Sequence, residues 1–426
     1  MYYILTLLLM NLSYGQMFDN TSVNYDTTVS IDIVGDLDKA YNAHKPYAAD
    51  AKPVKGFLIF HEPTIKIPTV LLCRGGIYPT NLRFLIPADK NLLLNTPLSN
   101  VDFSTISKLE LSSDKYHGLS DNIDTVSKNI FYDKDGEIPF LKMVNRRTRH
   151  DDKIWQQTTM LREYYTYKIY EKVFSPIRHY KVKLAKINYY DVSISNYLDE
   201  LTLEDSKIYQ NTQKGQYGFF IEPKKSMLKR AKVKSFDAEE VANWCKAKSQ
   251  KTYSCIFGRI KEIGYNIDLD SFVSFLLFNN WFGGKDWSIP GWNITAVTSS
   301  DKTLYFIPYD FDETTYNLDV ALAKPFDSSY LYDDDGALRI YMKTYKIEKK
   351  DICIAIKKVL ENARSKWFEL APIVDQYNAA TETLGKDSIQ KCARYNDCNS
   401  LDLAKIIADS LGVITTWDVS NCYSAQ

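Results

Sequence analysis

The chain has 426 residues, 45% of them hydrophobic and 25% charged, which suits one large two-lobed unit or two to three soluble domains. The 53 basic residues equal the 53 acidic residues, so the chain lacks the basic excess that a nucleic-acid-binding surface needs. We therefore expect no nucleic acid among the partners of this protein.

The N-terminus carries a short apolar run over residues 4–10, followed by small residues and Gln16. This pattern is typical of a secretory signal peptide over residues 1–15; the alternative is an N-terminus that is disordered or forms a strand. No other segment approaches the length of apolar sequence that a membrane-spanning helix needs. We therefore expect a secreted, periplasmic or cell-surface protein without a transmembrane segment.

Seven cysteines are present. Two pairs, Cys245 with Cys255 and Cys392 with Cys398, are close enough in sequence for local disulfides in an oxidising compartment. The alternative is that these cysteines are buried free thiols. No Cys-x-x-Cys pair occurs and the chain has five histidines, so we expect no structural zinc site.

Residues 16–54 are polar and predict a loosely attached arm, in which the alternation of Thr28–Ile33 indicates an edge strand. The β-branched and aromatic runs that begin at Gly56 predict antiparallel strands of one sheet. Arg74 lies where this sheet turns through a pair of glycines, within reach of a phosphate oxygen. The alternative is a plain turn with a solvated arginine.

The next strand, Phe140–Val144, presents Lys142 on the face opposite to its two neighbours. A helix over residues 152–173 follows, because apolar residues recur there every four positions. The stripe consists of Leu161, Tyr165, Ile169 and Val173.

Glu163 lies on a second face of this helix that is also partly apolar, so we expect the helix to be covered on two sides. A buried carboxylate is costly without a partner. Lys142 is the candidate partner, and local pairing with Arg162 or Tyr167 is the alternative.

Two strand patterns come next. Residues 179–194 predict a strand, a turn and a second strand, and Gln216–Pro223 predicts a buried strand that ends at Glu222. A basic cluster follows, which serves a nucleotide or an acidic substrate or else forms a solvated face. Its members are Lys224, Lys225, Lys229 and Arg230.

The second half of the chain is predicted to be mainly helical. Asp237 and Glu240 form a capping pair for the helix that they begin. Residues 269–282 are apolar nearly all round, which indicates a core helix, and further helices are expected over 348–370 and 400–411.

Candidate chemistry lies in two stretches. The loop KDWSIPGWNIT carries Asp286 and Asn293, and the strand YFIPYDFD ends in Asp310 and Asp312. Carboxylate and amide oxygens hold divalent metals and can orient a hydroxyl for attack on a phosphate. The alternative is that the last two aspartates close a turn.

These stretches resemble the CotH-type kinases, an atypical kinase family, and in particular its secreted branch. Four further segments fit the family in the same order: CRGG at 73–76, FLKMV at 140–144, MLREYYTYKIYEKV at 160–173 and QYGFFIEPKKSMLKR at 216–230. The resemblance implies an α+β, protein-kinase-like two-lobed fold, with a β-rich N-terminal lobe over residues 55–222 and a mainly helical C-terminal lobe over 223–426.

The resemblance also implies binding of ATP with Mg²⁺ or Mn²⁺. Lys142 becomes the strand lysine that contacts the α- and β-phosphates, and Glu163 becomes the helix glutamate that pairs with it. Arg74 is expected beside the phosphates. Glu222 or a later residue is expected to meet the adenine, because Pro223 has no N–H to donate.

In the same family pattern Asp286 is the catalytic aspartate, and Asn293 and Asp310 are metal ligands, with Asp312 as a further carboxylate. The implied activity is phosphoryl transfer from ATP to a protein hydroxyl, with the substrate protein and the oligomeric state left open. One alternative is transfer of AMP on the same fold. The other is a pseudokinase-like binding module, favoured by the missing Gly-x-Gly-x-x-Gly loop and the missing His-Arg before Asp286.

Overall fold

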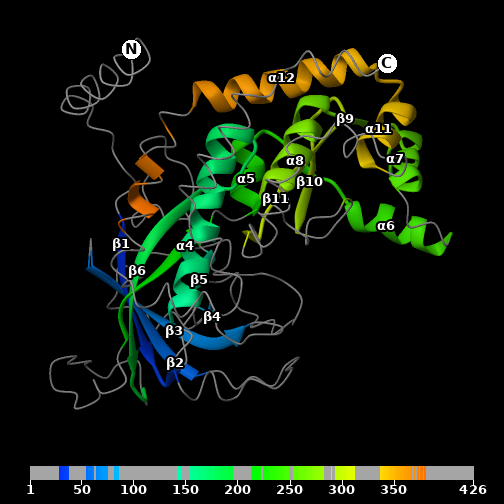
Figure 1. Ribbon diagram of the computed structural model, residues 1–426. Coiled ribbons are helices and arrows are strands. Elements are labelled where there is room, and N and C mark those ends of the chain that lie inside the picture. The colour runs from blue at the N-terminus through cyan, green and yellow to red at the C-terminus, as the bar shows by residue number, and fades with distance from the viewer. Residues whose placement is uncertain are drawn as a thin grey trace, which may run out of the picture.

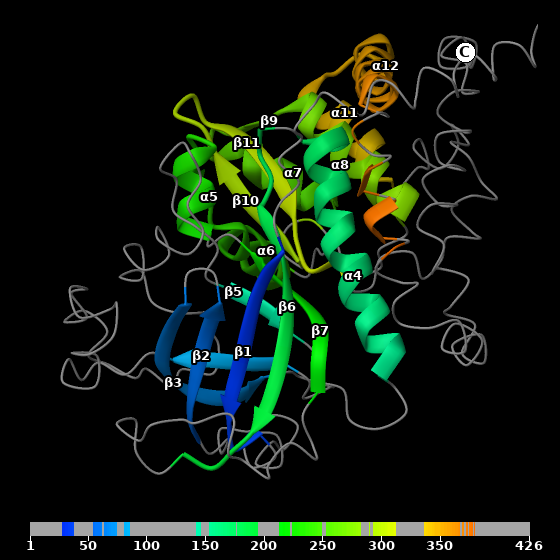
Figure 2. The same cartoon turned by 90° about the vertical axis from the view of Figure 1, so that its left-hand side faces the viewer.

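The computed structural model describes residues 28–37, 54–61, 64–74, 81–85, 142–145, 153–175, 177–194, 213–221, 224–248, 253–282, 289, 293–311, 336–366, 369, 372–373, 375–377 and 379. These residues form a mixed α/β structure with two sheets (Figures 1 and 2). The strands are β1 (Val29–Gly35), β2 (Val54–His61), β3 (Thr64–Arg74), β4 (Asn81–Leu85), β5 (Lys142–Asn145), β6 (Val182–Asp191), β7 (Gln213–Ile221), β8 (Lys234–Ser235), β9 (Asn266–Ile267), β10 (Ile294–Thr298) and β11 (Thr303–Pro308).

The helices lie at two places along the chain. A long helix and its continuation lie between β5 and β6, and the other helices follow β7. They are α4 (Lys153–Ile169) with the π-helical turn η5 (Tyr170–Phe174), α5 (Lys224–Arg230), α6 (Ala238–Ala247), α7 (Tyr253–Glu262), α8 (Leu269–Phe282), α11 (Ala337–Tyr345) and α12 (Lys349–Ser365).

The larger sheet has seven strands in the order β4-β3-β2-β1-β6-β7-β5. Neighbouring strands are antiparallel except for β1 and β6, which are parallel. The sheet curls, because Cα atoms of its two edge strands, β4 and β5, approach within 8 Å. The predicted antiparallel strands that begin at Gly56 are therefore confirmed as β2, β3 and β4. The strand, turn and second strand expected over residues 179–194 are instead one strand, β6.

Strand β1 corrects the prediction of an edge strand in a loosely attached arm, because it pairs with β2 on one side and β6 on the other. Ile31 and Ile33 are fully buried, as expected for the apolar half of the alternation. The polar half is buried as well: Asp32 accepts a hydrogen bond from Asn188 Nδ2 at 2.8 Å and lies 3.0 Å from His61 Nε2. Asp32 thus has polar partners on both flanking strands, and these partners allow a strand with a buried carboxylate to lie inside the sheet.

Helix α4, continued by η5, confirms the helix predicted over residues 152–173 and its burial on two sides. Its stripe residues are buried, and so are Glu163 and Tyr167 on the second face. Tyr164 packs against Phe219 of β7, with ring centroids 6.0 Å apart. Tyr170, just beyond the helix, packs against Phe278 of α8 at 4.8 Å. Figure 2 shows α4 running beside the larger sheet and reaching the smaller sheet and the helices around it.

The smaller sheet has four strands in the order β8-β10-β11-β9. Its centre is the antiparallel hairpin β10–β11, and α8 packs on β11 through Phe272 and Phe306 at 6.3 Å. Helix α8 begins and ends as the apolar run 269–282 predicts. The predicted cap of α6 is confirmed, because the Glu240 N–H donates to Asp237 Oδ1 at 2.9 Å.

A disulfide joins Cys245 of α6 to Cys255 of α7, which confirms one of the two predicted local pairs. Cys392 and Cys398 lie outside the described residues, as do the predicted signal peptide and the helix over 400–411. None of the helices in the described ranges has the length and apolar composition that would let it cross a bilayer.

Close packing at Gly56 gives a test of the curled sheet. A Cβ atom there would lie 2.6 Å from Leu71 Cδ1 and 2.7 Å from the Val34 carbonyl oxygen, and the latter is backbone. We expect Gly56→Ala to lower the free energy of unfolding by about 1–3 kcal/mol, because the strands must move apart. Urea unfolding of the purified chain measures this change.

The matched control is Gly258→Ala on α7, where an added Cβ meets no atom within 4 Å. This variant should gain up to about 1 kcal/mol, since alanine is the better helix former. A Gly56→Ala variant as stable as the wild type would contradict the described pairing of β1, β2 and β3.

Candidate functional site

The β10–β11 hairpin brings Asn293 and Asp310 together. Asn293 directly precedes β10, and Tyr309 and Asp310 directly follow β11. Ile294 pairs with Pro308 at the end of the ladder. One step further out, the Tyr309 N–H donates to the Asn293 carbonyl oxygen at 2.9 Å. The two candidate metal ligands therefore lie at the same end of one hairpin.

Both residues have left-handed backbone conformations, with φ of 49° at Asn293 and 64° at Asp310, and both are half-buried. Left-handed conformations are uncommon outside glycine, although Asn and Asp adopt them more readily than other residues. Held at functional sites, such conformations store strain of order 1–3 kcal/mol. The surrounding contacts must therefore hold this end of the hairpin in place.

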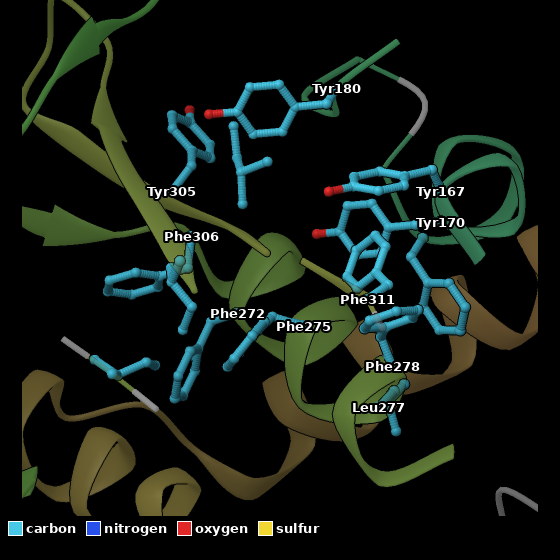
Figure 3. Packing of buried hydrophobic residues seen from close by; sticks show 14 of the residues in the cluster. Tyr167, Tyr170, Tyr180, Phe272, Phe275, Leu277, Phe278, Tyr305, Phe306 and Phe311 are labelled. Carbon is cyan, nitrogen blue, oxygen red and sulfur yellow. The ribbon is translucent and has the colours of Figure 1, made fainter. Parts of the chain in front are cut away.

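Helix α4 supplies one of these contacts. The Asp310 N–H donates a 2.8 Å hydrogen bond to the Tyr167 hydroxyl oxygen. The next residue, Phe311, is fully buried, and its ring lies 4.4 Å from the ring of Tyr167 and 5.1 Å from that of Phe278. Figure 3 shows these three rings and Tyr170 gathered between α4, α8 and the end of β11.

Glu163 belongs to the same group of side chains. It is 2% exposed and lies one helical turn before Tyr167, so both residues are on one face of α4. Burial raises the pKa of Tyr167, and the nearby carboxylates of Glu163 and Asp310 raise it further. Tyr167 therefore remains a neutral hydroxyl, and the carboxylates of Glu163 and Asp310 both lie within electrostatic reach of it.

The backbone of β5 places Lys142 opposite Ile221, the last residue of β7. Glu222, the expected adenine contact, is the next residue and lies outside the described ranges. Arg74 ends β3 and pairs with Asn81 of β4, the strand whose Cα atoms approach β5. The strands that carry Arg74 and Lys142 are thus near neighbours around the curled sheet, while the ion pair between Lys142 and Glu163 stays a prediction.

Two further contacts to the hairpin come from the segment between η5 and β6. The Tyr180 hydroxyl and Thr295 Oγ1 form a buried hydrogen bond of 2.8 Å. The Arg178 guanidinium lies over the ring of Tyr305, 3.6 Å from its centroid. Both residues were missed by the sequence analysis, because no local pattern indicates which distant strand they contact. The sequence analysis did name Tyr167, because its spacing from Glu163 places both on one helix face, but not its contact with Asp310.

Asn293 and Asp310 carry an amide and a carboxylate oxygen, the donor type that Mg²⁺ and Mn²⁺ prefer, at the same end of the hairpin. Asp286 and Asp312, the other predicted acids, lie outside the described residues. Within the described ranges, no three His, Cys, Asp or Glu side chains are grouped closely enough to form a metal site. A metal held by Asn293 and Asp310 would need further acidic ligands from outside the described ranges.

Comparison of the chain with protein-family models, with curated proteins and with solved structures gave no match.

His179, next to Tyr180, makes the stability of this region depend on pH. Its ring is buried, and its Nδ1 donates to the Ser175 carbonyl oxygen at 2.8 Å. Burial lowers its pKa from 6.5 to about 4, an effect that Glu171 opposes and Arg230 reinforces. The folded state therefore keeps the ring neutral at pH values where the unfolded chain takes up a proton.

The wild type should lose about 3 kcal/mol of stability as the pH falls from 6.5 towards 4, because protonation then favours the unfolded state. His179→Gln keeps a donor for the Ser175 carbonyl oxygen but has no ring to protonate. Between pH 6.5 and 4 its free energy of unfolding should therefore fall by about 3 kcal/mol less than that of the wild type. Urea unfolding at a series of pH values gives the two slopes. Parallel slopes would contradict a buried neutral ring.

Proposed function

We propose that this protein is an ATP- and metal-dependent transferase of the CotH kinase type, which moves a phosphoryl group to a hydroxyl of a protein substrate. One observation carries the proposal: Asn293 and Asp310 lie at the same end of one hairpin, and the helix that bears Glu163 is hydrogen-bonded to the backbone of Asp310. The motif resemblance assigns the same three residues to one site.

The arrangement of elements supports a two-lobed kinase-like fold. The larger sheet and α4 would form the β-rich lobe, in which the strand with Lys142 is followed by the helix with Glu163 and then by β6 and β7. The smaller sheet and the helices after β7 would form the second lobe. The end of β7 would connect the two at Glu222.

In this proposal each side chain has a distinct role. Lys142, held by Glu163, would neutralise phosphate charge. Asp286 would orient the acceptor hydroxyl and take up its proton. Asn293 and Asp310, with Asp312 as a further carboxylate, would hold Mg²⁺ or Mn²⁺. When bound, the metal would offset the negative charge of the phosphates.

The Cys245–Cys255 disulfide supports a secreted, periplasmic or cell-surface location, because disulfides persist in oxidising compartments. The substrate would then be a protein that reaches the same compartment.

Ligand-dependent stabilisation tests the nucleotide site. A ligand that binds only the folded state stabilises it by about 2.7 kcal/mol at a concentration of about 100 times its Kd. We expect ATP with Mg²⁺ or Mn²⁺ to raise the melting temperature of the purified chain by several degrees, and Asp310→Asn to abolish most of the shift. Thermal-shift titrations with and without the metal measure both effects.

Asp301→Asn is the matched control, since Asp301 lies in the exposed turn at the opposite end of the same hairpin and should leave the shift intact. Asp286→Asn should keep the shift yet lower transfer by about 10²-fold or more. Mass spectrometry of the modified protein separates phosphoryl from AMP transfer. A wild type that shows no shift with either metal at millimolar ATP would refute the proposed function and leave the binding-module alternative.

A further inference from the structure

Tyr167 holds the backbone of Asp310 from a distant part of the chain. The hydrogen bond from the Asp310 N–H to the Tyr167 hydroxyl spans 143 positions. The neighbouring residue Tyr309 uses its own N–H within the hairpin, towards Asn293. Asp310 is thus the position after β11 at which the hairpin is bonded to α4.

The ring that carries this hydroxyl is fixed. Tyr167 is 3% exposed, and its ring packs against Phe311, at 4.4 Å, and Phe219 of β7, at 5.8 Å. A buried and closely packed ring has little freedom to rotate, so the position of the hydroxyl follows the position of α4. The hydrogen bond from the Asp310 N–H then holds the backbone of Asp310 at the place set by that hydroxyl.

Asp310 needs such a contact because its φ of 64° is left-handed. A residue in this conformation persists only when its surroundings determine it. The direction of the Asp310 side chain depends on that backbone conformation. A hydrogen bond to its own N–H is therefore the most direct way to set where the carboxylate points.

We infer that Tyr167 is a positioning residue, whose hydroxyl sets the backbone of Asp310 so that its carboxylate can hold a metal ion when α4 is docked. This inference rests on the proposed function. Because Glu163 lies one turn away on the same helix, a displacement of α4 would move both Glu163 and the metal ligand Asp310. Docking of α4 would then couple the phosphate-binding and metal-binding halves of the site.

The test is Tyr167→Phe, which keeps the packed ring and removes the hydroxyl. Outer contacts of metal ligands affect metal affinity by about 10- to 100-fold. At fixed ATP, the Mn²⁺ concentration that gives half of the maximal thermal shift should rise about tenfold or more, while the melting temperature without ligand changes by only a few degrees. Amide hydrogen exchange at Asp310 should become faster in the same variant without any ligand.

Tyr170→Phe is the matched control. Tyr170 is equally buried and its ring also packs near Phe311, but its hydroxyl bonds the Ser175 side chain. This variant should leave both the Mn²⁺ midpoint and the exchange rate at Asp310 unchanged.

The outcomes separate this inference from the proposed function. If the wild type shifts with ATP and Mn²⁺ and Tyr167→Phe shifts at the same Mn²⁺ concentration, the positioning role is wrong and the proposed function stands. Equal changes of the Mn²⁺ midpoint in Tyr167→Phe and Tyr170→Phe would also overturn the positioning role, because the loss of a buried hydroxyl that does not contact Asp310 would then have the same effect. If the wild type shows no metal-dependent shift, the proposed function itself fails, and the metal-positioning role with it.

Discussion

Helix α4 is buried on two sides, and the arrangement of the other elements depends on this constraint. One side packs on the larger sheet through Tyr164 and Phe219, and Tyr170 continues the packing onto α8. The helix nevertheless contains Arg162 and Glu163, which are 4% and 2% exposed. Buried ionisable groups are costly without polar partners, so few rotations of the helix about its axis are acceptable. The same constraint fixes where Tyr167 meets the end of β11.

The β10–β11 hairpin explains how Asn293 and Asp310, which belong to separate sequence motifs, come to lie at one end of the same element. In an antiparallel pair, the residue before the first strand and the residue after the second are necessarily neighbours. Asn293 and Tyr309 occupy those positions around β10 and β11, and Asp310 is the residue after Tyr309. The bonds from Tyr180 to Thr295 and from Asp310 to Tyr167 then attach the hairpin to the α4–β6 connection and to α4 itself. Hairpin geometry thus brings the two residues to one end of β10 and β11, and the hydroxyls of Tyr180 and Tyr167 attach the hairpin to the rest of the fold.

Features that depend on local sequence could be predicted, and features that depend on distant contacts could not. The limits of α8 follow from its apolar run, and the cap of α6 follows from Asp237 and its spacing to Glu240. The central place of β1 did not follow, because Asp32 looks solvent-facing until its partners on β2 and β6 are known. For the site, the motifs indicated Asn293, Asp310 and Glu163. They did not indicate Tyr167 as the link, since a hydrogen bond across 143 positions leaves no periodic signal.

The backbone at Asn293 and Asp310 bears on whether the site performs chemistry. Within the described ranges, the other non-glycine residues with positive φ are Lys232, Lys302 and Lys346, which are exposed and lie in turns or at a helix end. Asn293 and Asp310 are half-buried and lie at the same end of the hairpin. Glycine would adopt either conformation without steric cost. In the proposed function, these two half-buried positions would supply the amide and the carboxylate oxygen of a metal site. The backbone strain would then be held where those oxygens are placed.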